Sequence, residues 1–594
     1  MNITNTPRYL ITTADERTWK FDRPVIFLGE WCRIHSRKQV WQELDAIVAE
    51  PYGLGLAKKD SDNAEARVLE GKLLLVLCKA LNQYHGVKHG ERFWQIVLGH
   101  WLRRYVDVIL NRVKTLEQCL RLHQISGTTA YTNPNYALAT PDSYSAIWAF
   151  NDDRWNNALN VLILELKGES NFPIEYISGC TSTGFQFNAL ATTPSVNKIN
   201  LKWGYQKASK IARLLAKDND VFIINSYLPK SVEIALQLAF VQCPQLWFST
   251  KLEISAKPDM VLRESLANLV VSKSSISLEN ILTSMVFELL PVCYLEGFAE
   301  LAKLVKQKPW PKRPKFILTS NNFDTDEEFK LWTATKVELG SKYITAQHGN
   351  NYGTHRYFGR FTPEEITADK FLTWGWTDGL LQHTPAFIFK KAQRKAQNYN
   401  PQGGVVLIEL NLNHRITTFD GTFEHINYFK EQQIFINELA RTSKQHLTVR
   451  LHSGYRYTTW SDEARWQAFD PALTIDTGGV PISDLIAQSR LVVHSYDSTG
   501  ILETLSQNIP TLAFWQNGFD HLRDNAKPYY QLLVDAGIVH FTPESVAQKV
   551  NEIWDDVDGW WVQSNVQGAR KQFSERYARV SYNPVSELKQ IILS

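Results

Sequence analysis

Short apolar runs alternate along the chain with longer segments that carry apolar residues on one face. The runs predict buried strands at residues 24–28, 221–225, 245–249, 315–319, 343–346, 370–373, 405–410, 447–451, 491–493 and 511–514. The segments between them predict helices at about 38–50, 64–81, 91–118, 142–167, 543–554 and 568–579. Strands that alternate with helices in this way are typical of an α/β protein with parallel sheets.

Two stretches interrupt this alternation. Residues 168–200 are rich in Ser, Thr, Gly and Asn, which predicts a loop or a substrate-facing excursion. Residues 390–404 combine charges, a proline and two glycines, which predicts a domain boundary. Because 594 residues exceed what one core usually supports, we expect a first domain over 1–395 with helical insertions, a second over 396–565, and a closing helical segment over 566–594.

Composition and charge narrow the class of protein. A formal net charge of +3 leaves no electrostatic footprint for nucleic acid. No apolar run approaches the roughly 20 residues that span a bilayer, and the first residues lack the features of a signal peptide. The six cysteines have no close pair, which favours reduced core residues over disulfides or a zinc site. We therefore expect a cytoplasmic protein; peripheral association with inner-membrane machinery is compatible with these features.

The segment 484–515 carries the most informative chemistry. It predicts a short helix, a buried strand, a polar turn over 494–500, a helix from Ile501 and a second strand. The first amides of a helix have no partner within the helix and lie at the positive end of its dipole, so they can hold an anion together with the hydroxyls of Ser495, Ser498 and Thr499. Glu503, one turn further on, can accept both hydroxyls of a ribose. The alternative is an ordinary capped helix between two strands.

This segment, together with Thr448-Val-Arg-Leu-His-Ser453 and Tyr343-Ile-Thr-Ala-Gln-His-Gly-Asn-Asn-Tyr-Gly353, resembles glycosyltransferases of the GT-B class. Within that class it resembles bacterial enzymes that build capsules, O-antigens and teichoic acids from CMP- or CDP-activated donors. Residues 27–33 and 93–102 resemble a group of uncharacterised bacterial surface-carbohydrate transferases. The resemblance implies two facing Rossmann-like domains with an enlarged helical N-terminal domain. The first domain would present the acceptor, the second would bind the nucleotide sugar, and the terminal helix would cross back to the first.

The resemblance also suggests residues that contact the donor. Arg415 stands where the related CDP-glycerol enzymes carry an arginine after their first C-terminal strand, and His452 matches a histidine of a His-Pro-like motif in which Ser453 replaces the proline. Arg450 and His452 bracket the end of a predicted strand. Side chains of these types can donate hydrogen bonds to the leaving phosphate. The alternative for each is a purely structural role as a surface or capping residue.

Three residues are candidates for catalysis. Glu30, at the end of the first predicted strand, is the first choice for a general base, since a carboxylate at the edge of a cleft can take the proton of an acceptor hydroxyl. A salt bridge to Arg33 or Arg37 is the structural alternative. His348 is expected to face the donor's phosphate or sugar carboxylate, or else to be a turn histidine. Asp497, with Glu296, is a weaker carboxylate candidate because it would also suit a helix cap.

Neither a metal nor a cofactor is predicted. Asp324 and Asp326 have the Asp-x-Asp form of another transferase class, but the helical run that follows favours a capping role. His85 and His89 have zinc-ligand spacing, but Gly86 and Gly90 disfavour a helix there.

The sequence thus predicts a metal-independent glycosyltransferase. The enzymes it resembles include Kdo and sialic-type transferases, and this resemblance implies that it moves a Kdo-like or nonulosonic sugar (sialic or pseudaminic type) from a CMP-activated donor to a glycan or lipid-linked glycan acceptor of a surface polysaccharide. The alternatives are a CDP-glycerol or polyol phosphotransferase and, because Ser453 departs from the motif, an inactive scaffold in a polysaccharide assembly complex. The sequence leaves the stereochemical course and the oligomeric state open.

Overall fold

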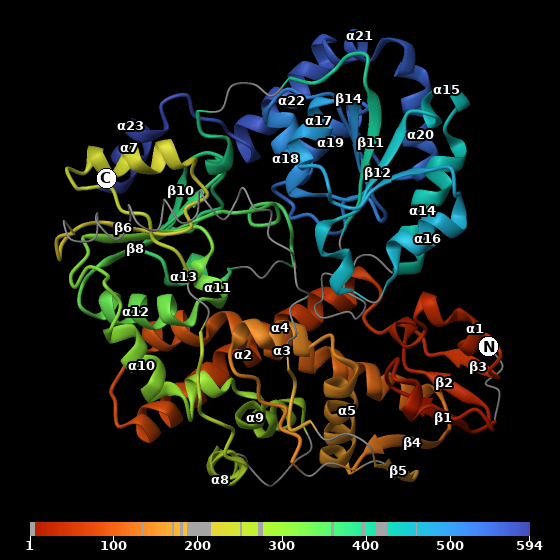
Figure 1. Cartoon of the computed structure of the whole chain (residues 1–594), viewed down its shortest axis with the longest axis vertical. Helices are drawn as coiled ribbons and strands as arrows, with labels where there is room; N and C mark the ends of the chain where they lie inside the picture. The colour runs from red at the N-terminus through yellow and green to blue at the C-terminus, as the bar shows by residue number, and fades with distance from the viewer. Residues whose placement is uncertain are drawn as a thin grey trace.

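The computed structural model describes residues 6–132, 135–168, 171–178, 182–186, 216–249, 252–270, 277–357, 361–393, 398–410, 425–458 and 460–594. These residues form three parallel sheets with helices around them, and Figure 1 shows the sheets as separate regions of the molecule. The α/β class with parallel sheets is therefore confirmed. The region expected to form one Rossmann-like domain before residue 396 contains two of the three sheets.

The first sheet has the strand order β3-β2-β1-β4-β5. Its strands are β1 (Arg8–Ile11), β2 (Val25–Phe27), β3 (Ala46–Val48), β4 (Ile125–Tyr131) and β5 (Ile174–Ile177). The helix predicted over 38–50 is wrong in its second half: α1 (Lys38–Trp41) is a single turn, and residues 46–48 pair with β2. Part of the stretch predicted as a loop, residues 174–177, is likewise a strand, because it pairs with β4.

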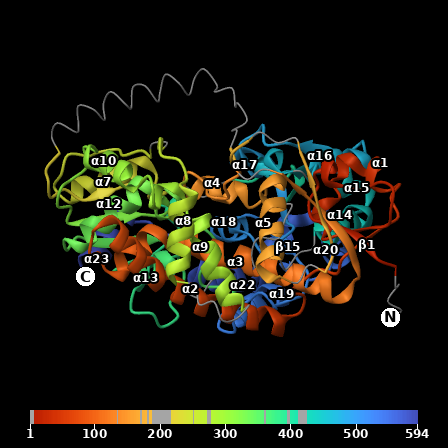
Figure 2. The same ribbon diagram turned by 90° about the horizontal axis from the view of Figure 1, so that it is seen from below.

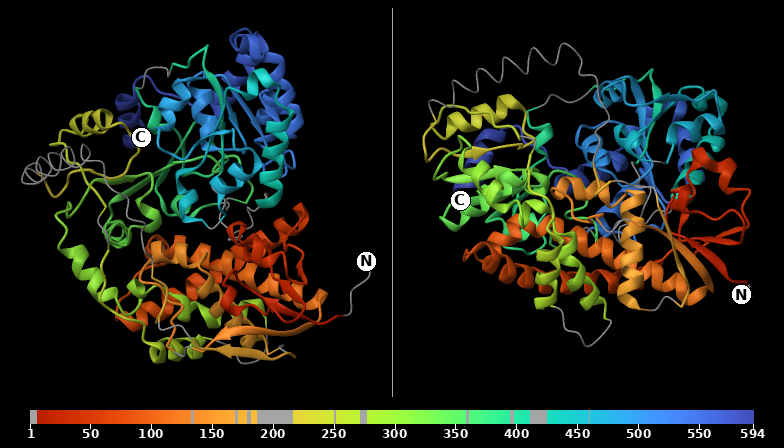
Figure 3. Two further views of the ribbon diagram at one scale, coloured as in Figure 1. Left: turned by 45° about the vertical axis from the view of Figure 1, so that its right-hand side comes forward. Right: turned by 60° about the horizontal axis from the view of Figure 1, so that its bottom comes forward.

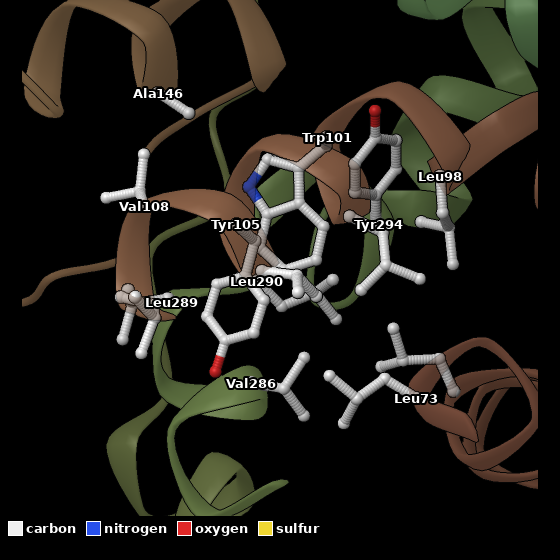
Figure 4. Packing of buried hydrophobic residues seen from close by; sticks show 14 of the residues in the cluster. Leu73, Leu98, Trp101, Tyr105, Val108, Ala146, Val286, Leu289, Leu290 and Tyr294 are labelled. Atoms are coloured by element: carbon white, nitrogen blue, oxygen red, sulfur yellow. The ribbon is translucent and has the colours of Figure 1, made fainter. Parts of the chain in front are cut away.

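Two long helices connect β3 to β4, namely α2 (Leu56–His85) and α3 (Glu91–Leu122), and they pack against each other. The helical layer that α2 and α3 form also contains α4 (Ser143–Ala149), α5 (Asp153–Lys167), α8 (Met260–Val270) and α9 (Leu278–Leu289). Figure 2 shows α8 and α9 beside α3 and α5. In Figure 4, Trp101 and Tyr105 of α3 pack with Val286 and Leu290. The Tyr105 hydroxyl donates to the Leu282 carbonyl at 2.6 Å, which satisfies the one polar atom of this buried ring.

The second sheet has the order β10-β9-β8-β7-β6. Its strands are β6 (Phe222–Ile223), β7 (Phe316–Thr319), β8 (Lys342–Ala346), β9 (Lys370–Thr373) and β10 (His383–Pro385). Its helices are α7 (Lys230–Ala239), α10 (Phe298–Lys306), α11 (Asn322–Thr325), α12 (Glu327–Glu338) and α13 (Pro363–Thr367). The strand predicted at 245–249 is only an isolated bridge between Ile224 and Trp247. We call each sheet with the helices around it a region and number the regions in chain order. Helix α3 of the first region packs against α12 and α13 of the second, so it joins these two regions.

The third sheet has the order β13-β12-β11-β14-β15-β16. Its strands are β11 (Gly404–Ile408), β12 (Leu447–Arg450), β13 (Thr474–Asp476), β14 (Ser489–His494), β15 (Thr511–Phe514) and β16 (Val539–His540). Its helices are α14 (His425–Glu438), α15 (Arg441–Lys444), α16 (Asp462–Phe469), α17 (Ile482–Ala487), α18 (Thr499–Ser506), α19 (Lys527–Asp535), α20 (Pro543–Ile553), α21 (Val557–Trp561) and α22 (Ser564–Tyr577).

The C-terminal segment divides between two regions. Helix α22 packs against α18 and α19 of the third region, whereas α23 (Pro584–Leu593) packs against α7 of the second. Leu588 is fully buried in the same core cluster as β6 to β9. Figures 1 and 3 show the C-terminus beside the second sheet. Among the described residues, no helix is long and apolar enough to cross a membrane.

Candidate active site

The loops that follow β8 and β14 meet each other. Residues 347–353 follow β8, and residues 495–498 follow β14 and lead into α18. The backbone N–H of Asn350 donates to Thr499 Oγ1 at 2.9 Å. A Cβ atom on Gly349 would lie 3.2 Å from the same oxygen, so a larger residue there would crowd the contact. Parallel α/β sheets bind ligands at the carboxyl ends of their strands. The junction of these two loops is therefore the candidate active site.

Asp497 lies at the centre of this junction. Its Oδ1 accepts a hydrogen bond from Asn350 Nδ2 at 2.9 Å, and its Oδ2 accepts from His355 at 3.0 Å, His521 at 3.1 Å and the Tyr530 hydroxyl at 2.8 Å. Burial opposes its charge, but the bonds from the two histidines outweigh burial and hold the pKa of Asp497 well below its usual range. Asp497 is thus a buried anion that joins the second region to the third.

The same group is the one set of side chains, among the described residues, that could hold a metal ion. The ligand atoms of His355, Asp497 and His521 all lie within 4.8 Å of one another. However, Asp497 Oδ2 also accepts from Tyr530, and hydrogen bonds between protein groups already account for the convergence of these atoms. The three residues come from distant parts of the chain, so no spacing in the sequence pointed to them.

Ser498 and Ser495 have structural partners. Ser498 is the N-cap of α18, since its Oγ accepts from the backbone N–H of Ile501 at 3.2 Å. Ser495 Oγ donates to the Ile408 carbonyl at 2.8 Å and lies 2.6 Å from the Tyr428 hydroxyl. The structure therefore gives the cap of α18 to Ser498 and not to Asp497. Both serines fix the turn that aims α18 at the loop after β8.

Glu503 lies on the side of α18 that faces the second region. Its carboxylate is 3.3 Å from Lys391 Nζ and 3.9 Å from Lys390 Nζ, and its side chain is 25% exposed. Lys390 Nζ also lies 4.9 Å from the ring centroid of Tyr227. Both lysines belong to the stretch 390–404 that is predicted to be a domain boundary. The structure instead places them at the junction, where they bring positive charge beside the N-terminal half of α18.

His348 is half-buried in the loop after β8. Its ring centroid lies 5.8 Å from that of Phe323 and 6.3 Å from that of Tyr227. Its Nδ1 is 2.8 Å from the Tyr352 hydroxyl. Burial lowers the pKa of His348 to about 4, and the nearby Lys390 acts in the same direction. The imidazole is therefore neutral at physiological pH.

The remaining candidates lie elsewhere. Arg450 donates to Asp476 at 2.5 Å and to the Val480 carbonyl at 2.6 Å. His452 caps a 3₁₀ turn by accepting from the Gly454 N–H at 3.0 Å. Neither contacts the α18 turn in any hydrogen bond of the described chain, and Arg415 lies outside the described residues.

Glu30 is not brought to the junction. It begins the 3₁₀ helix Glu30–Cys32, and this turn sets it beside Arg33, with which it pairs. The pair lines a separate cavity of about 270 Å³ between the first region and α14 and α16, together with Trp41, Trp460 and Arg465. The structural alternative to a general base, a salt bridge to Arg33, is thus present in the structure.

The two predicted Asp-x-Asp residues have structural contacts. Asp326 accepts from the Phe329 N–H at 3.0 Å and is the N-cap of α12, which confirms the capping interpretation. Asp324 accepts from Arg104 of α3 at 2.6 Å. The pair therefore stabilises the packing of α11, α12 and α3.

Two Rossmann-like sheets that meet at the carboxyl ends of their strands define the GT-B class of transferase fold. In this protein a further parallel sheet precedes them. The sequence model of the LIC12162 family of transferases matches residues 8–592, and the chain belongs to this family.

Solved structures that match this chain include three kinds of protein. A putative UDP-N-acetylglucosamine 2-epimerase from Listeria monocytogenes is 14% identical, with 64% of this chain and 96% of that chain covered and a TM-score of 0.34. The wall teichoic acid polymerase TagF with CDPG is 11% identical over 68% and 98% of the two chains, with a TM-score of 0.29. The spinosyn rhamnosyltransferase SpnG with thymidine diphosphate is 12% identical over 79% and 100%, with a TM-score of 0.26. At these values the likeness transfers neither ligands nor residue roles. No protein with a curated description matches the chain.

Proposed function

We propose that this transferase is a glycosyltransferase that moves a Kdo-like or nonulosonic sugar from a CMP-activated donor to a surface polysaccharide acceptor. The observation that carries the proposal is the docking of the His348 loop on the N-terminus of α18 through Asn350 and Thr499. This contact brings the loop that carries the neutral His348 imidazole to the end of a helix whose first amides can bind an anion. Membership of a transferase family supports the reaction class.

The donor is assigned to the α18 side of the junction. The N-terminal amides of a helix favour an anion, and Lys390 and Lys391 add two positive charges close to Glu503. A CMP-linked acidic sugar carries two anionic groups, its phosphodiester and its carboxylate, which suits this set of donors. Glu503, held by the lysines, is proposed to accept the hydroxyls of the ribose.

The acceptor is assigned to the second region. A cavity of about 780 Å³ lies at the carboxyl ends of β6 and β7, and its lining includes Asn225, Asn321, Asn322 and Tyr144. Amide groups donate to and accept from sugar hydroxyls, and an aromatic ring packs on a sugar face. Phe323, the next residue along α11, is the ring close to His348. Asn322 of the cavity lining and Phe323 beside His348 are thus neighbours on the same helix.

The chemical step follows from these positions. The acceptor hydroxyl oxygen attacks the anomeric carbon of the donor, and the bond from that carbon to the phosphate oxygen breaks. CMP leaves with the bonding electron pair, stabilised by the α18 amides and the lysines. The proton of the hydroxyl passes to Nε2 of His348. Atoms and charge balance without a redox partner.

The test is a donor panel. Purified protein is incubated with CMP- and CDP-linked donors and with glycan acceptors, and both nucleotide release and the mass of the acceptor product are measured. We expect CMP release from a CMP-sugar and a product heavier by one sugar. A product heavier by one polyol phosphate would instead identify the phosphotransferase. CMP binding without turnover of any donor would identify a scaffold.

The role of His348 is tested with His348→Gln. We expect transfer to fall about a hundredfold to ten-thousandfold, the range for loss of a general base, while CMP affinity changes little. His446→Gln, at an exposed histidine, is the matched control. Near-normal transfer by His348→Gln would remove His348 from the mechanism.

A further inference from the structure

His348 is one end of a buried hydrogen-bonded chain. Its Nδ1 lies 2.8 Å from the hydroxyl of Tyr352, and that hydroxyl donates to Glu364 Oε1 at 2.7 Å. Tyr352 is fully buried four residues beyond His348 in the same loop, and Glu364 is buried in α13. Three polar groups from two elements thus converge behind the imidazole. Tyr352 lies in the segment 343–353 that resembles GT-B enzymes, but the sequence singles out neither Tyr352 nor Glu364 as a functional residue.

The central group of this hydrogen-bonded series, the Tyr352 hydroxyl, has one proton to donate. A tyrosine hydroxyl has a single hydrogen, so it can donate to only one of its two neighbours. A carboxylate is the stronger acceptor, because hydrogen bonds to ionised groups are stronger than neutral ones. When Glu364 is ionised, the Tyr352 hydrogen is directed to Glu364, and the Tyr352 oxygen must accept from His348. Nδ1 then carries the proton of the neutral imidazole, and Nε2 keeps its lone pair.

We propose that Tyr352 and Glu364 are positioning residues that fix the tautomer of His348, so that Nε2 is the nitrogen able to take the acceptor proton. This inference rests on the proposed function, in which His348 is the general base. It adds to that function the reason why one of two equivalent-looking ring nitrogens is basic. The logic is that of a base oriented by a third group.

The groups around Glu364 determine the pH at which its carboxyl group is ionised and can direct the Tyr352 hydrogen. From α3, His100 Nε2 lies 3.4 Å from Glu364 Oε2, and Arg103 and Arg104 add positive charge. Negative charge comes from the adjacent Glu365, and Asp324 lies beyond His100, 3.7 Å from its Nδ1.

Two further groups face Glu364. The Thr362 hydroxyl donates a hydrogen bond that favours the carboxylate, and the ring of Tyr343 approaches from β8.

Burial prevails among these effects and raises the pKa of Glu364 to about 7. Glu364 therefore changes its charge within the working range of pH. Above about pH 7 the carboxylate directs the Tyr352 hydrogen. Below it, the neutral acid accepts more weakly and the preference for one His348 tautomer decreases. The pKa of His348 itself is several units lower, so the two titrations are separate.

The direct test reads the tautomer without any substrate. Full-length protein carrying ¹⁵N-labelled histidine is studied by NMR at pH 8, where the ¹⁵N shift separates protonated from unprotonated ring nitrogens. The His348 signals are assigned by their loss in His348→Gln. We expect a protonated Nδ1 in the wild type and a mixture of tautomers in Tyr352→Phe and in Glu364→Gln. A protonated Nε2 in the wild type, or an unchanged tautomer in Tyr352→Phe, would overturn the proposal.

A matched control separates the relay from simple loss of a buried hydroxyl. Tyr343 is also fully buried near Glu364, and its hydroxyl has no hydrogen-bond partner within the described residues. Tyr343→Phe should therefore leave the His348 signals as in the wild type. If Tyr343→Phe shifts the tautomer as much as Tyr352→Phe does, the effect comes from packing and the proposal fails.

The kinetic consequence is a pH profile. In the wild type, kcat should fall as pH decreases through about 7, since the ionised form of Glu364 is the active one. In Glu364→Gln this limb should disappear, and kcat above pH 8 should be lower by about tenfold to a hundredfold, less than the loss of the base itself would cost. The KM for the donor should stay constant. A retained limb near pH 7 in Glu364→Gln would overturn the assignment to Glu364. Absence of turnover with every donor would refute the proposed function alone, because the NMR result does not depend on it.

Discussion

The buried carboxylate of Asp497 offers the sharpest test of how the second and third regions are joined. The change is Asp497→Asn, which keeps the shape of the side chain and removes its charge. In the wild type, Oδ2 accepts from His355, His521 and Tyr530, and Oδ1 accepts from Asn350. An asparagine has one oxygen and one NH₂ group. Whichever way the amide is turned, its NH₂ faces at least one of these donors.

The magnitude follows from this geometry. In the better orientation the oxygen faces the three donors, the NH₂ group faces Asn350, and one hydrogen bond is lost. The remaining bonds then go to a neutral group, and loss of a hydrogen bond to a charged group costs about 1.5 to 3 kcal/mol in the free energy of unfolding. Asp520→Asn is the control, since Asp520 is exposed and a surface substitution usually changes that free energy by less than about 0.5 kcal/mol.

The assays are denaturant unfolding and hydrogen–deuterium exchange. We expect a lower unfolding midpoint and faster exchange in the loop 347–356 and at the start of α18 in Asp497→Asn, but not in Asp520→Asn. The pKa of Asp497 is depressed in the folded protein. Its contribution to the free energy of unfolding is therefore fully present above the pKa of the unfolded chain and is lost as pH falls from there through the folded pKa. A variant within 1 kcal/mol of the wild type, with unchanged exchange in the loop, would refute this account.

Three further predictions concern the site. Excess chelator should change neither turnover nor thermal stability, because hydrogen bonds account for the convergence of His355, Asp497 and His521; a loss that a divalent ion restores would show that this group holds a metal. Glu503→Ala should weaken CMP binding by about 1.5 to 3 kcal/mol in calorimetry, as expected for loss of a charge-assisted pair with the ribose; unchanged or tighter binding would mean that Glu503 only balances Lys391. Glu30→Gln should keep transfer near the wild-type rate and cost little stability, because the partner Arg33 is partly exposed; a hundredfold slower enzyme of normal stability would return the general base to Glu30.

The sequence by itself determined the elements whose buried positions follow a local periodic pattern of apolar residues. The strand at 491–493, the polar turn and the helix that follows were all predicted within a few residues, since the apolar run, the polar turn residues and the helical spacing are local signals. The cap of α12 by Asp326 was predicted for the same reason. Strands β1 and β4 were missed. Strand β4, Ile125–Tyr131, contains glycine and threonines and gains its burial only from the neighbours it pairs with.

The tertiary structure alone decided which side chains form the site. His355, His521 and Tyr530 reach Asp497 from positions 142, 24 and 33 residues away, and Glu364 reaches Tyr352 from another element. Such convergence leaves no periodic trace, because hydrogen bonds between separate elements depend on how helices and sheets pack and not on spacing along the chain. Glu30 shows the reverse case. Its position at a strand end suggested an active-site carboxylate, and a 3₁₀ turn directed it to the nearest arginine instead.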